Sequence, residues 1–347
     1  MSRHRPPPEP KAAPTGAEAR AFDRWAMDSC AVPGAALMER AGTHAATLVH
    51  DLIEEHARRR PRASRVVVLA GGGDNGGDAR IVARCLSLWG YEVRLLETSP
   101  DDRSDVLTRG RLRAEPCASI PEADLVSLLA SADVVIDGML GTGATGPLRG
   151  EVARASKALA EACASSVGRP LVVALDVPTG VDAGSGSTTK FAVRAALTVA
   201  FGWPKLGTLL YPARAYCGRI VAVEIGFPAA DSDEARADEL PEFRWAALDA
   251  GWAAHVLPVR RGDAHKNAAG PVLVVAGSEG MAGAAILAGR GALRSGAGYL
   301  RIASVASNRE SVQAGLPEAV WVDRTDGDAL ADALAASRAV VVGPGMG

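Results

Sequence analysis

One glycine-rich segment contains side chains that could carry out chemistry. Residues 65–78 read Arg-Val-Val-Val-Leu-Ala-Gly-Gly-Gly-Asp-Asn-Gly-Gly-Asp, so Asp74, Asn75 and Asp78 stand among glycines that follow a short apolar run. Glycine permits a tight turn and a close approach of the backbone to a ligand, and a helix start presents free N–H groups to an anion. A loop made only for phosphate would not normally carry two carboxylates. The segment therefore indicates polar chemistry as well as phosphate binding.

Three further polar segments follow apolar runs in the same way. They are Asp137 with Gly141-Thr-Gly143, Asp176-Val-Pro-Thr179-Gly180, and Pro204-Lys205-Leu-Gly207. Lysine is a rare choice in this chain, which gives Lys205 added weight. Ligands gather at the carboxyl ends of the strands of an open parallel sheet. We therefore expect all four segments to converge on one edge.

The side chains of these segments fit two kinds of chemistry. Asn75, Asp137 and Thr179 supply oxygen atoms suited to a hard cation. The segments contain no histidine or cysteine, which disfavours zinc. Asp176 and Lys205 could form an acid/base pair, because opposite charges tune each other's pKa and either group can move a proton.

Simpler interpretations exist for each segment alone. The residues from Asp176 could form a proline turn, Asp137 could cap a helix, and Lys205 could be a surface charge. The glycines at 71–76 also satisfy Gly-x-Gly-x-x-Gly, and Glu97 lies where a ribose-binding acid would, as in an NAD-dependent dehydrogenase. The shared position of all four segments at strand ends favours a common site.

The elements that would position these residues alternate along the chain. Residues 17–60 read as helix, interrupted at Pro33-Gly34. Apolar runs separated mostly by helix-length segments lie at 66–70, 92–96, 133–137, 171–176, 196–201 and 219–224. Continuous apolar strands joined by helices predict an α/β fold, a mostly parallel sheet covered on both faces in a three-layer sandwich.

The chain divides into two expected domains. Residues 1–16 are expected to be a disordered tail, 17–228 the first domain, 229–243 an acidic linker, and 244–347 a second β/α series. Its expected strands lie at 271–276, 299–304, 319–322 and 339–342, and its expected helix lies at about 282–295. A glycine-rich turn after the last strand should open a helix, so we expect this second domain to be incomplete.

Composition excludes several classes of protein. A formal net charge of −2 gives no basic footprint for nucleic acid. No apolar run is long enough to span a membrane, and the first residues lack the apolar core of a secretory signal. Five scattered cysteines suit reduced thiols. We therefore expect a cytoplasmic protein that binds neither nucleic acid nor membrane.

Together with Leu37-Met-Glu-Arg-Ala-Gly42, the four segments resemble those of the NAD(P)H-hydrate epimerase family. Later segments resemble the start of the ADP-dependent NAD(P)H-hydrate dehydratases: Ala264-His-Lys266, the residues 276–285 and 292–298, Pro317-Glu318, and 342–347. Their order is that of the bifunctional bacterial repair enzymes. The resemblance implies a Rossmann-like first domain, the first part of a ribokinase-like second domain, and a chain that could form homo-oligomers.

The resemblance also implies an activity. NADH or NADPH that has added water across a nicotinamide double bond (NADHX and NADPHX) exists as two epimers, which the first domain would interconvert. The second domain type removes the water with ADP or ATP. Asn75, Asp137 and Thr179 would hold potassium, and Asp176 and Lys205 would be the catalytic acid/base pair. The hydrate would contact Asp74, Asn75, Gly76, Gly77, Asp78, Gly141, Thr142, Gly143, Ala144, Thr145, Gly146, Pro147 and Asp176, and in the second domain Ala284 and Gly345.

This sequence departs from the family pattern at several positions. Asp74 and Ala79 stand where the family usually has asparagine and glycine, and the charge of Asp74 bears on the preference for the phosphorylated substrate. Thr179 replaces serine but keeps the hydroxyl. The segment His265-Lys-Asn-Ala-Ala-Gly270 departs from the usual dehydratase pattern, and that family's nucleotide-binding loop and catalytic aspartate have no counterpart here. We therefore expect no dehydration by this chain. The alternative to an enzyme is a binding scaffold of the same fold.

Overall fold

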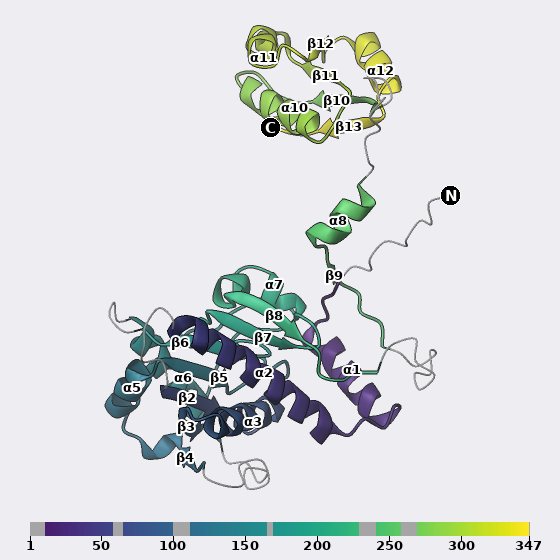
Figure 1. Ribbon diagram of the computed structural model, residues 1–347. Helices are drawn as coiled ribbons and strands as arrows, with labels where there is room; N and C mark the ends of the chain where they lie inside the picture. The colour runs from purple at the N-terminus through teal and green to yellow at the C-terminus, as the bar shows by residue number, and fades with distance from the viewer. Residues whose placement is uncertain are drawn as a thin grey trace. The chain divides into compact units, whose positions relative to one another are not determined.

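The computed structural model describes residues 11–57, 65–99, 112–164, 169–228, 241–257 and 269–346. The chain divides into two compact units, Met1–Ala254 and His255–Gly347. Figure 1 shows both units, and each is described here by itself.

The first unit is built on a seven-stranded sheet in which all neighbouring strands are parallel. The strand order is β4-β3-β2-β5-β6-β7-β8. The strands are β2 (Arg65–Ala70), β3 (Glu92–Glu97), β4 (Ala114–Pro116), β5 (Val134–Gly138), β6 (Leu171–Leu175), β7 (Leu197–Phe201) and β8 (Arg219–Val223). The order reverses direction between β2 and β5, which is where such sheets bind ligands.

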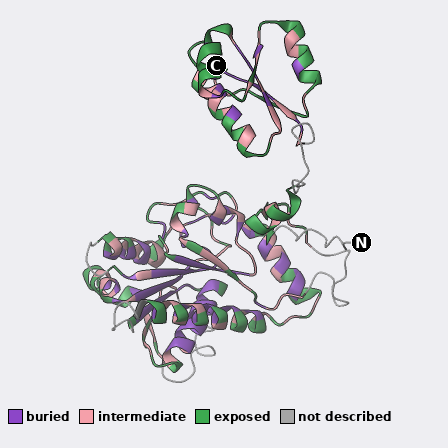
Figure 2. Cartoon of the chain, turned by 45° about the horizontal axis from the view of Figure 1, so that its top comes forward, coloured by how far each residue is buried: buried purple, intermediate pink, exposed green. Residues whose placement is uncertain are grey.

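Helices cover both faces of this sheet, which confirms the predicted three-layer α/β fold (Figure 1). Alternate residues of a strand point to opposite faces. Val66 and Val68 of β2 pack with α2 (Gly34–Ala57) and α3 (Asp74–Leu88), whereas Val67 and Leu69 pack with α5 (Glu122–Ser131) and α6 (Gly150–Ala164). Figure 2 shows the buried residues along these strands. The first unit also contains α1 (Gly16–Asp28), α7 (Leu206–Leu209), η1 (Cys117–Ser119) and η2 (Ala213–Tyr216).

The N-terminal residues are more ordered than predicted. β1 (Lys11–Ala12) pairs antiparallel with β9 (Ala246–Ala247). Thr15 caps α1 and forms a reciprocal capping box with Glu18. The expectation of a disordered tail is therefore wrong for residues 11–16, because backbone pairing and the cap satisfy their polar groups. Residues 1–10 lie outside the described residues.

The boundary between the units also differs from the prediction. It follows residue 254, within α8 (Ala250–Val256), and β9 belongs to the first unit through its pairing with β1. The predicted start of the second domain, at residue 244 of 244–347, therefore lies within the first unit. Most of the expected linker 229–243, namely 229–240, lies outside the described residues.

The second unit contains a four-stranded parallel sheet of order β12-β11-β10-β13. Its strands are β10 (Pro271–Val275), β11 (Tyr299–Ser304), β12 (Val320–Asp323) and β13 (Ala339–Val342). The helices are α10 (Ala282–Arg294), α11 (Arg309–Gly315) and α12 (Gly327–Ala335), with η4 at Ala306–Asn308. α10 and α11 pack on one face of the sheet and α12 on the other.

All five cysteines of the chain are free thiols. Among the described helices, none combines the length and the apolar character that crossing a bilayer would require.

Candidate functional site

The side chain of Asn75 connects the segments after β5 and at the end of β6, at the point where the strand order reverses. It lies in the first turn of α3, and its side-chain nitrogen donates to the carbonyl oxygens of Leu140, at 2.8 Å, and Leu175, at 3.1 Å. These carbonyls belong to the segments that follow β5 and end β6. The side-chain oxygen Oδ1 of Asn75 is buried and has no hydrogen-bond partner among the described residues. A buried polar atom without a partner is costly, so this atom marks a site that a ligand could complete.

Asp137 and Thr179 meet beside Asn75. Asp137 is the last residue but one of β5 and is fully buried. Its Oδ1 accepts from the Thr179 hydroxyl at 2.7 Å, and its Oδ2 accepts from the Thr179 backbone N–H at 2.8 Å. The same hydroxyl accepts from the backbone N–H of Leu140, whose carbonyl binds Asn75. The backbone of Leu140 thus connects the three residues predicted to hold a cation.

The electrostatics of Asp137 fit a bound cation. Burial raises its pKa to about 6, although the hydrogen bonds from Thr179 act in the opposite direction. Within the described part of the chain, its carboxylate forms no ion pair. A buried carboxylate without a counter-charge and an orphaned amide oxygen both gain from a positive ion. The observed oxygen donors therefore suit a hard cation.

Asp176 and Lys205 form a buried ion pair on the same edge of the sheet. The ammonium of Lys205 donates to Asp176 Oδ1 and, at 2.7 Å, to the carbonyl of Phe201. Only 3% of Lys205 is exposed. Asp176 has φ +60°, a left-handed conformation that costs free energy in a residue other than glycine. Such strain is typical of positions whose side chain is held for function.

Gly141 borders the space between Asn75 and Asp176. A Cβ atom placed on Gly141 would lie 3.2 Å from Asn75 Cβ and 3.7 Å from Asp176 Oδ2. The free oxygen of Asp176 therefore faces the predicted substrate loop. The structure brings together the four segments that the sequence predicted to converge.

Two glycines of the segment, Gly71 and Gly76, allow close packing of the backbone. A Cβ on Gly71 would lie 1.9 Å from the carbonyl oxygen of Met139, and one on Gly76 would lie 1.9 Å from that of Gly71. Glu97, which the dehydrogenase interpretation assigned to a ribose, instead accepts two hydrogen bonds from the fully buried Arg80, at 3.0 and 3.1 Å. This ion pair disfavours an NAD-dependent dehydrogenase.

Two further carboxyls, those of Asp78 and Asp23, have raised pKa values. Burial raises the pKa of Asp78 well above its usual value, and the charges of Asp176, Asp74 and Asp23 add to this effect. Burial also raises the pKa of Asp23, in α1, to about 6, while Lys205 opposes the shift. Sequence reasoning missed Asp23. The available signal was an acid placed between the apolar residues Phe22 and Trp25.

Part of the predicted substrate loop lines a cavity of about 400 Å³, although none of Asn75, Asp137, Asp176 and Lys205 lines it. Its wall includes residues 144–149, Gly180 and Asp182. In the second unit, a Cβ on Gly345 would lie 2.7 Å from Ala284 Cβ. The two residues predicted there are therefore neighbours, on the start of α10 and the segment after β13.

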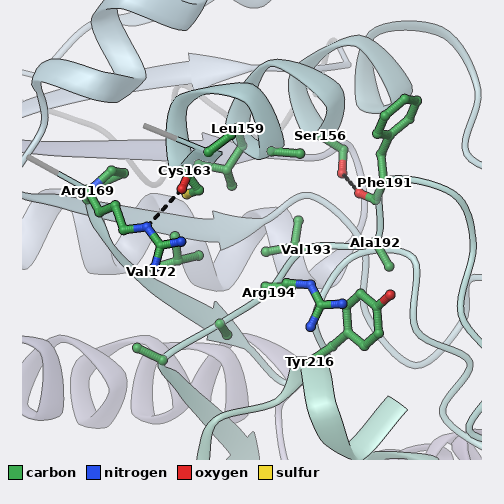
Figure 3. Close-up of a pocket in the computed structure, with 15 residues that line it drawn as sticks. Ser156, Leu159, Cys163, Arg169, Val172, Phe191, Ala192, Val193, Arg194 and Tyr216 are labelled. Atoms are coloured by element: carbon green, nitrogen blue, oxygen red, sulfur yellow. Dashed lines mark hydrogen bonds between the residues drawn. The ribbon is translucent and has the colours of Figure 1, made fainter. Parts of the chain in front are cut away.

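A larger cavity, of about 560 Å³, lies at the other edge of the first sheet, beside the starts of β6 and β7 (Figure 3). Arg169 donates to the carbonyl of Cys163, and the guanidinium of Arg194 lies 4.0 Å from the ring centre of Tyr216. None of the predicted site residues lines this cavity. We assign the candidate site to the carboxyl edge of the sheet, where the charged and strained residues lie.

Comparison with known proteins identifies two families along the chain. Residues 34–207 match the family described as YjeF-related protein N-terminus, and residues 272–347 match that described as NAD(P)H-hydrate dehydratase. An NAD(P)H-hydrate epimerase of Rhodopirellula baltica is 36% identical over 214 residues, covering 60% of this chain and 82% of that protein.

Longer relatives match over both units. A bifunctional NAD(P)H-hydrate repair enzyme of Thermanaerovibrio acidaminovorans is 37% identical over 351 residues, covering 94% of this chain and 64% of that protein. The chain thus spans less than two thirds of the length of this relative. A solved ADP/ATP-dependent NAD(P)H-hydrate dehydratase of Bacillus subtilis, co-crystallised with ATP and Mg²⁺, is 27% identical, covers 25% of this chain and 41% of that chain, and has a TM-score of 0.21.

Proposed function

The chain belongs to the YjeF-related family that includes NAD(P)H-hydrate epimerases, and from this premise we propose that its first unit interconverts the two epimers of NADHX and of NADPHX. The observation that carries the proposal is the meeting of the Asn75–Asp137–Thr179 donors with the Asp176–Lys205 pair at one edge of the sheet. A non-catalytic scaffold would not need a buried ion pair at the same edge as an unpaired amide oxygen, Oδ1 of Asn75, that could bind a cation.

The chemistry of the hydrate sets what the site must do. Hydration of an enamine places the hydroxyl on the carbon next to the ring nitrogen. That carbon can invert when the hydroxyl leaves one face and returns on the other, with a proton given and a proton taken. We propose Asp176 and Lys205 as the acid/base pair. Lys205 holds Oδ1 of Asp176, so Oδ2 is left facing Gly141 to exchange the proton.

Asn75, Asp137 and Thr179 would hold a potassium ion. The partnerless Oδ1 of Asn75 and the buried carboxylate of Asp137 support this assignment. When bound, the ion would supply a fixed positive charge beside the hydrate. The protein residues around the ion would orient the ring of the hydrate.

The substrate would occupy the space bordered by residues 74–78 and 141–147. Both NADHX and NADPHX are proposed as substrates. Asp74 places a carboxylate where the family usually has an amide, and this charge would weaken binding of a nearby phosphate. We therefore expect the balance between the two substrates to change in the variant Asp74→Asn.

The second unit is proposed to act on the same hydrate as a dehydratase, with ADP or ATP as its co-substrate and with Ala284 and Gly345 against the hydrate. This dehydratase activity is a proposal from the family match. It is tested by measuring the loss of the S epimer with and without ADP.

The epimerase proposal is tested with an unequal mixture of the two epimers. The epimer ratio is followed by chromatography with protein and with buffer alone. We expect the protein to accelerate the approach to equilibrium, and Asp176→Asn to abolish the acceleration. Equal rates with the wild-type protein and with buffer would instead favour the scaffold.

A further inference from the structure

A fully buried arginine, Arg80, lies beside the glycine-rich segment of the candidate site. It belongs to the second turn of α3. Its Nε and Nη2 atoms donate to Oε1 of Glu97, at 3.1 and 3.0 Å, and its Nη1 atom donates to the backbone carbonyl of Gly71 at 3.1 Å. One guanidinium therefore joins α3 to the end of β3 and to the loop that follows β2.

The ion pair with Glu97 does not explain why an arginine is needed here. Buried ion pairs can often be replaced by apolar residues of similar volume with no loss of stability. The carbonyl of Gly71 is different, because Gly71 is buried and, in the part of the chain that the structure describes, Arg80 is the only donor to its oxygen. A buried carbonyl without a donor is costly. Arg80 thus satisfies a backbone group that an apolar side chain would leave without a partner.

The backbone of Gly71 contacts both elements that carry the proposed cation ligands. Its N–H donates to the carbonyl of Gly138, the residue after Asp137, at 3.1 Å. A Cβ on Gly76 would lie 1.9 Å from the carbonyl oxygen of Gly71, so this oxygen touches the turn of α3 that carries Asn75. Gly71 therefore lies between the end of β5 and the first turn of α3.

The position of this first turn decides where the side chain of Asn75 lies. Its Nδ2 atom donates to the carbonyls of Leu140 and Leu175, and its Oδ1 atom stays without a partner among the described residues. Hydrogen bonds weaken steeply when their length and angle change. A displaced first turn would therefore weaken both bonds of Nδ2 and would move Oδ1 relative to Asp137 and Thr179.

We propose that Arg80 is a positioning residue for the cation site, and that its bond to Gly71 holds the first turn of α3 where Asn75 can bind the ion. The proposal rests on the cation site proposed above. Arg80 acts through the backbone of Gly71 and not by contact with the ion. Without this bond the oxygen donors would be less well ordered, and the protein would bind potassium more weakly.

The test measures the binding of potassium through its effect on the Tm of the full chain. Unfolding is followed at increasing concentrations of potassium chloride, with choline chloride keeping the ionic strength constant, and the rise in Tm gives the dissociation constant of the ion. The variant combines Arg80→Met with Glu97→Gln, which removes both charges and so leaves neither buried alone. We expect its dissociation constant for potassium to be about tenfold higher than that of the wild type, since the bond of a charged donor is lost.

Arg80→Lys is the conservative variant. Its ammonium keeps the charge beside Glu97 and can still donate to Gly71, but it lacks the planar fork that bonds both acceptors at fixed angles. Its dissociation constant for potassium should lie between those of the wild type and of the double variant. It carries the test on its own if the double variant does not fold.

The matched control combines Arg154→Met with Glu151→Gln. Arg154, on α6, pairs with Glu151 and donates to the carbonyls of Ile120 and Cys117, on the opposite face of the sheet from α3. This arginine also holds loop carbonyls, but they lie outside the candidate site. The control should therefore lower the Tm by the same amount at every potassium concentration.

Arg20 provides a second comparison, at the substrate loop. Its guanidinium, on α1, donates to the backbone carbonyl of Thr142 in that loop. Arg20→Met should therefore weaken the binding of the hydrate and leave the dissociation constant for potassium unchanged.

A merely structural role of Arg80 would lower the Tm of its variants equally at every potassium concentration. That result, in whichever of the two variants folds, would overturn the proposal and leave the epimerase function intact. A wild-type Tm that does not respond to potassium would overturn the proposal together with the cation site. The separate assay with the two epimers would still decide the epimerase function.

Discussion

The ion pair of Asp176 and Lys205 is the residue-level feature that most constrains the site. Removing one partner from a buried pair leaves an uncompensated charge, at a cost of about 3–5 kcal/mol. We predict that Lys205→Met lowers the free energy of unfolding by roughly this amount. The double variant with Asp176→Asn should recover much of the loss, although it stays inactive. Urea unfolding of the two single variants and the double variant measures this coupling. Additive losses would show that the two groups do not depend on each other.

A second prediction at the residue level concerns the proposed cation site. A ligand that binds only the folded state stabilises it by about 2.7 kcal/mol at one hundred times its dissociation constant. Replacing potassium chloride by choline chloride at equal ionic strength should therefore lower the Tm of the wild-type protein. Asp137→Asn should abolish the difference, because it removes the buried charge that the ion compensates. The same wild-type Tm in both salts would argue against the cation.

The raised pKa of Asp23 predicts how the free energy of unfolding depends on pH. Its pKa is raised from 3.8 to about 6, so the folded state binds more protons than the unfolded state between these values. Its contribution to the free energy of unfolding therefore falls as the pH rises through this window, and the cost is fully present above it. After allowance for its partial exposure, Asp23→Asn should stabilise the protein by about 2 kcal/mol at pH 7.5 and by almost nothing at pH 4. Urea midpoints at the two pH values measure this. Equal effects at both would refute it.

At the scale of elements, α1 is expected to order the substrate loop. A hydrogen bond from a charged donor contributes about 1.5–3 kcal/mol. Arg20→Met keeps the packing of the side chain but removes the bond to Thr142. We predict that it raises KM for the hydrate about tenfold, with a smaller effect on kcat. Arg24→Met is the matched control, because Arg24 is exposed on the same helix. An unchanged KM in Arg20→Met would show that the loop is ordered without α1.

The elements that the sequence predicted well are those with a continuous local pattern. The apolar runs at 66–70 and 196–201 lie within a residue or so of β2 and β7, because strands buried on both faces need unbroken apolar residues. β4 reads Ala-Glu-Pro and has no such pattern. The pairing of β1 with residues 246–247 joins segments far apart in the chain, and no local signal reveals it.

The same distinction applies to the site. Asn75, Asp137, Asp176 and Lys205 lie at or after the ends of predicted strands, and the rule for parallel sheets predicts that such residues share one edge. Asp23 belongs to a helix that precedes the sheet, and its position depends on how α1 docks. The ion pair of Glu97 with the buried Arg80 likewise depends on tertiary packing, which no local sequence pattern reveals.

At the scale of the whole molecule, each unit has its own parallel sheet and its own buried clusters. Every residue proposed for epimerisation lies within residues 1–254. A protein ending at residue 257 keeps β9 and all of α8. We therefore predict that it interconverts the epimers at a rate within about twofold of the full chain, because the groups that move protons and hold the ion are all retained.

This prediction is checked by comparing kcat/KM of residues 1–257 with that of the full chain at the same pH and potassium concentration. Circular dichroism of the shorter protein serves as the control for folding. Ala284→Trp in the full chain is the companion variant, since it alters only the hydrate contact proposed for the second unit. It should leave epimerisation unchanged. A tenfold loss in the folded shorter protein would mean that the second unit contributes to the epimerase site, and the assignment of that site to α1 and the first sheet alone would be wrong.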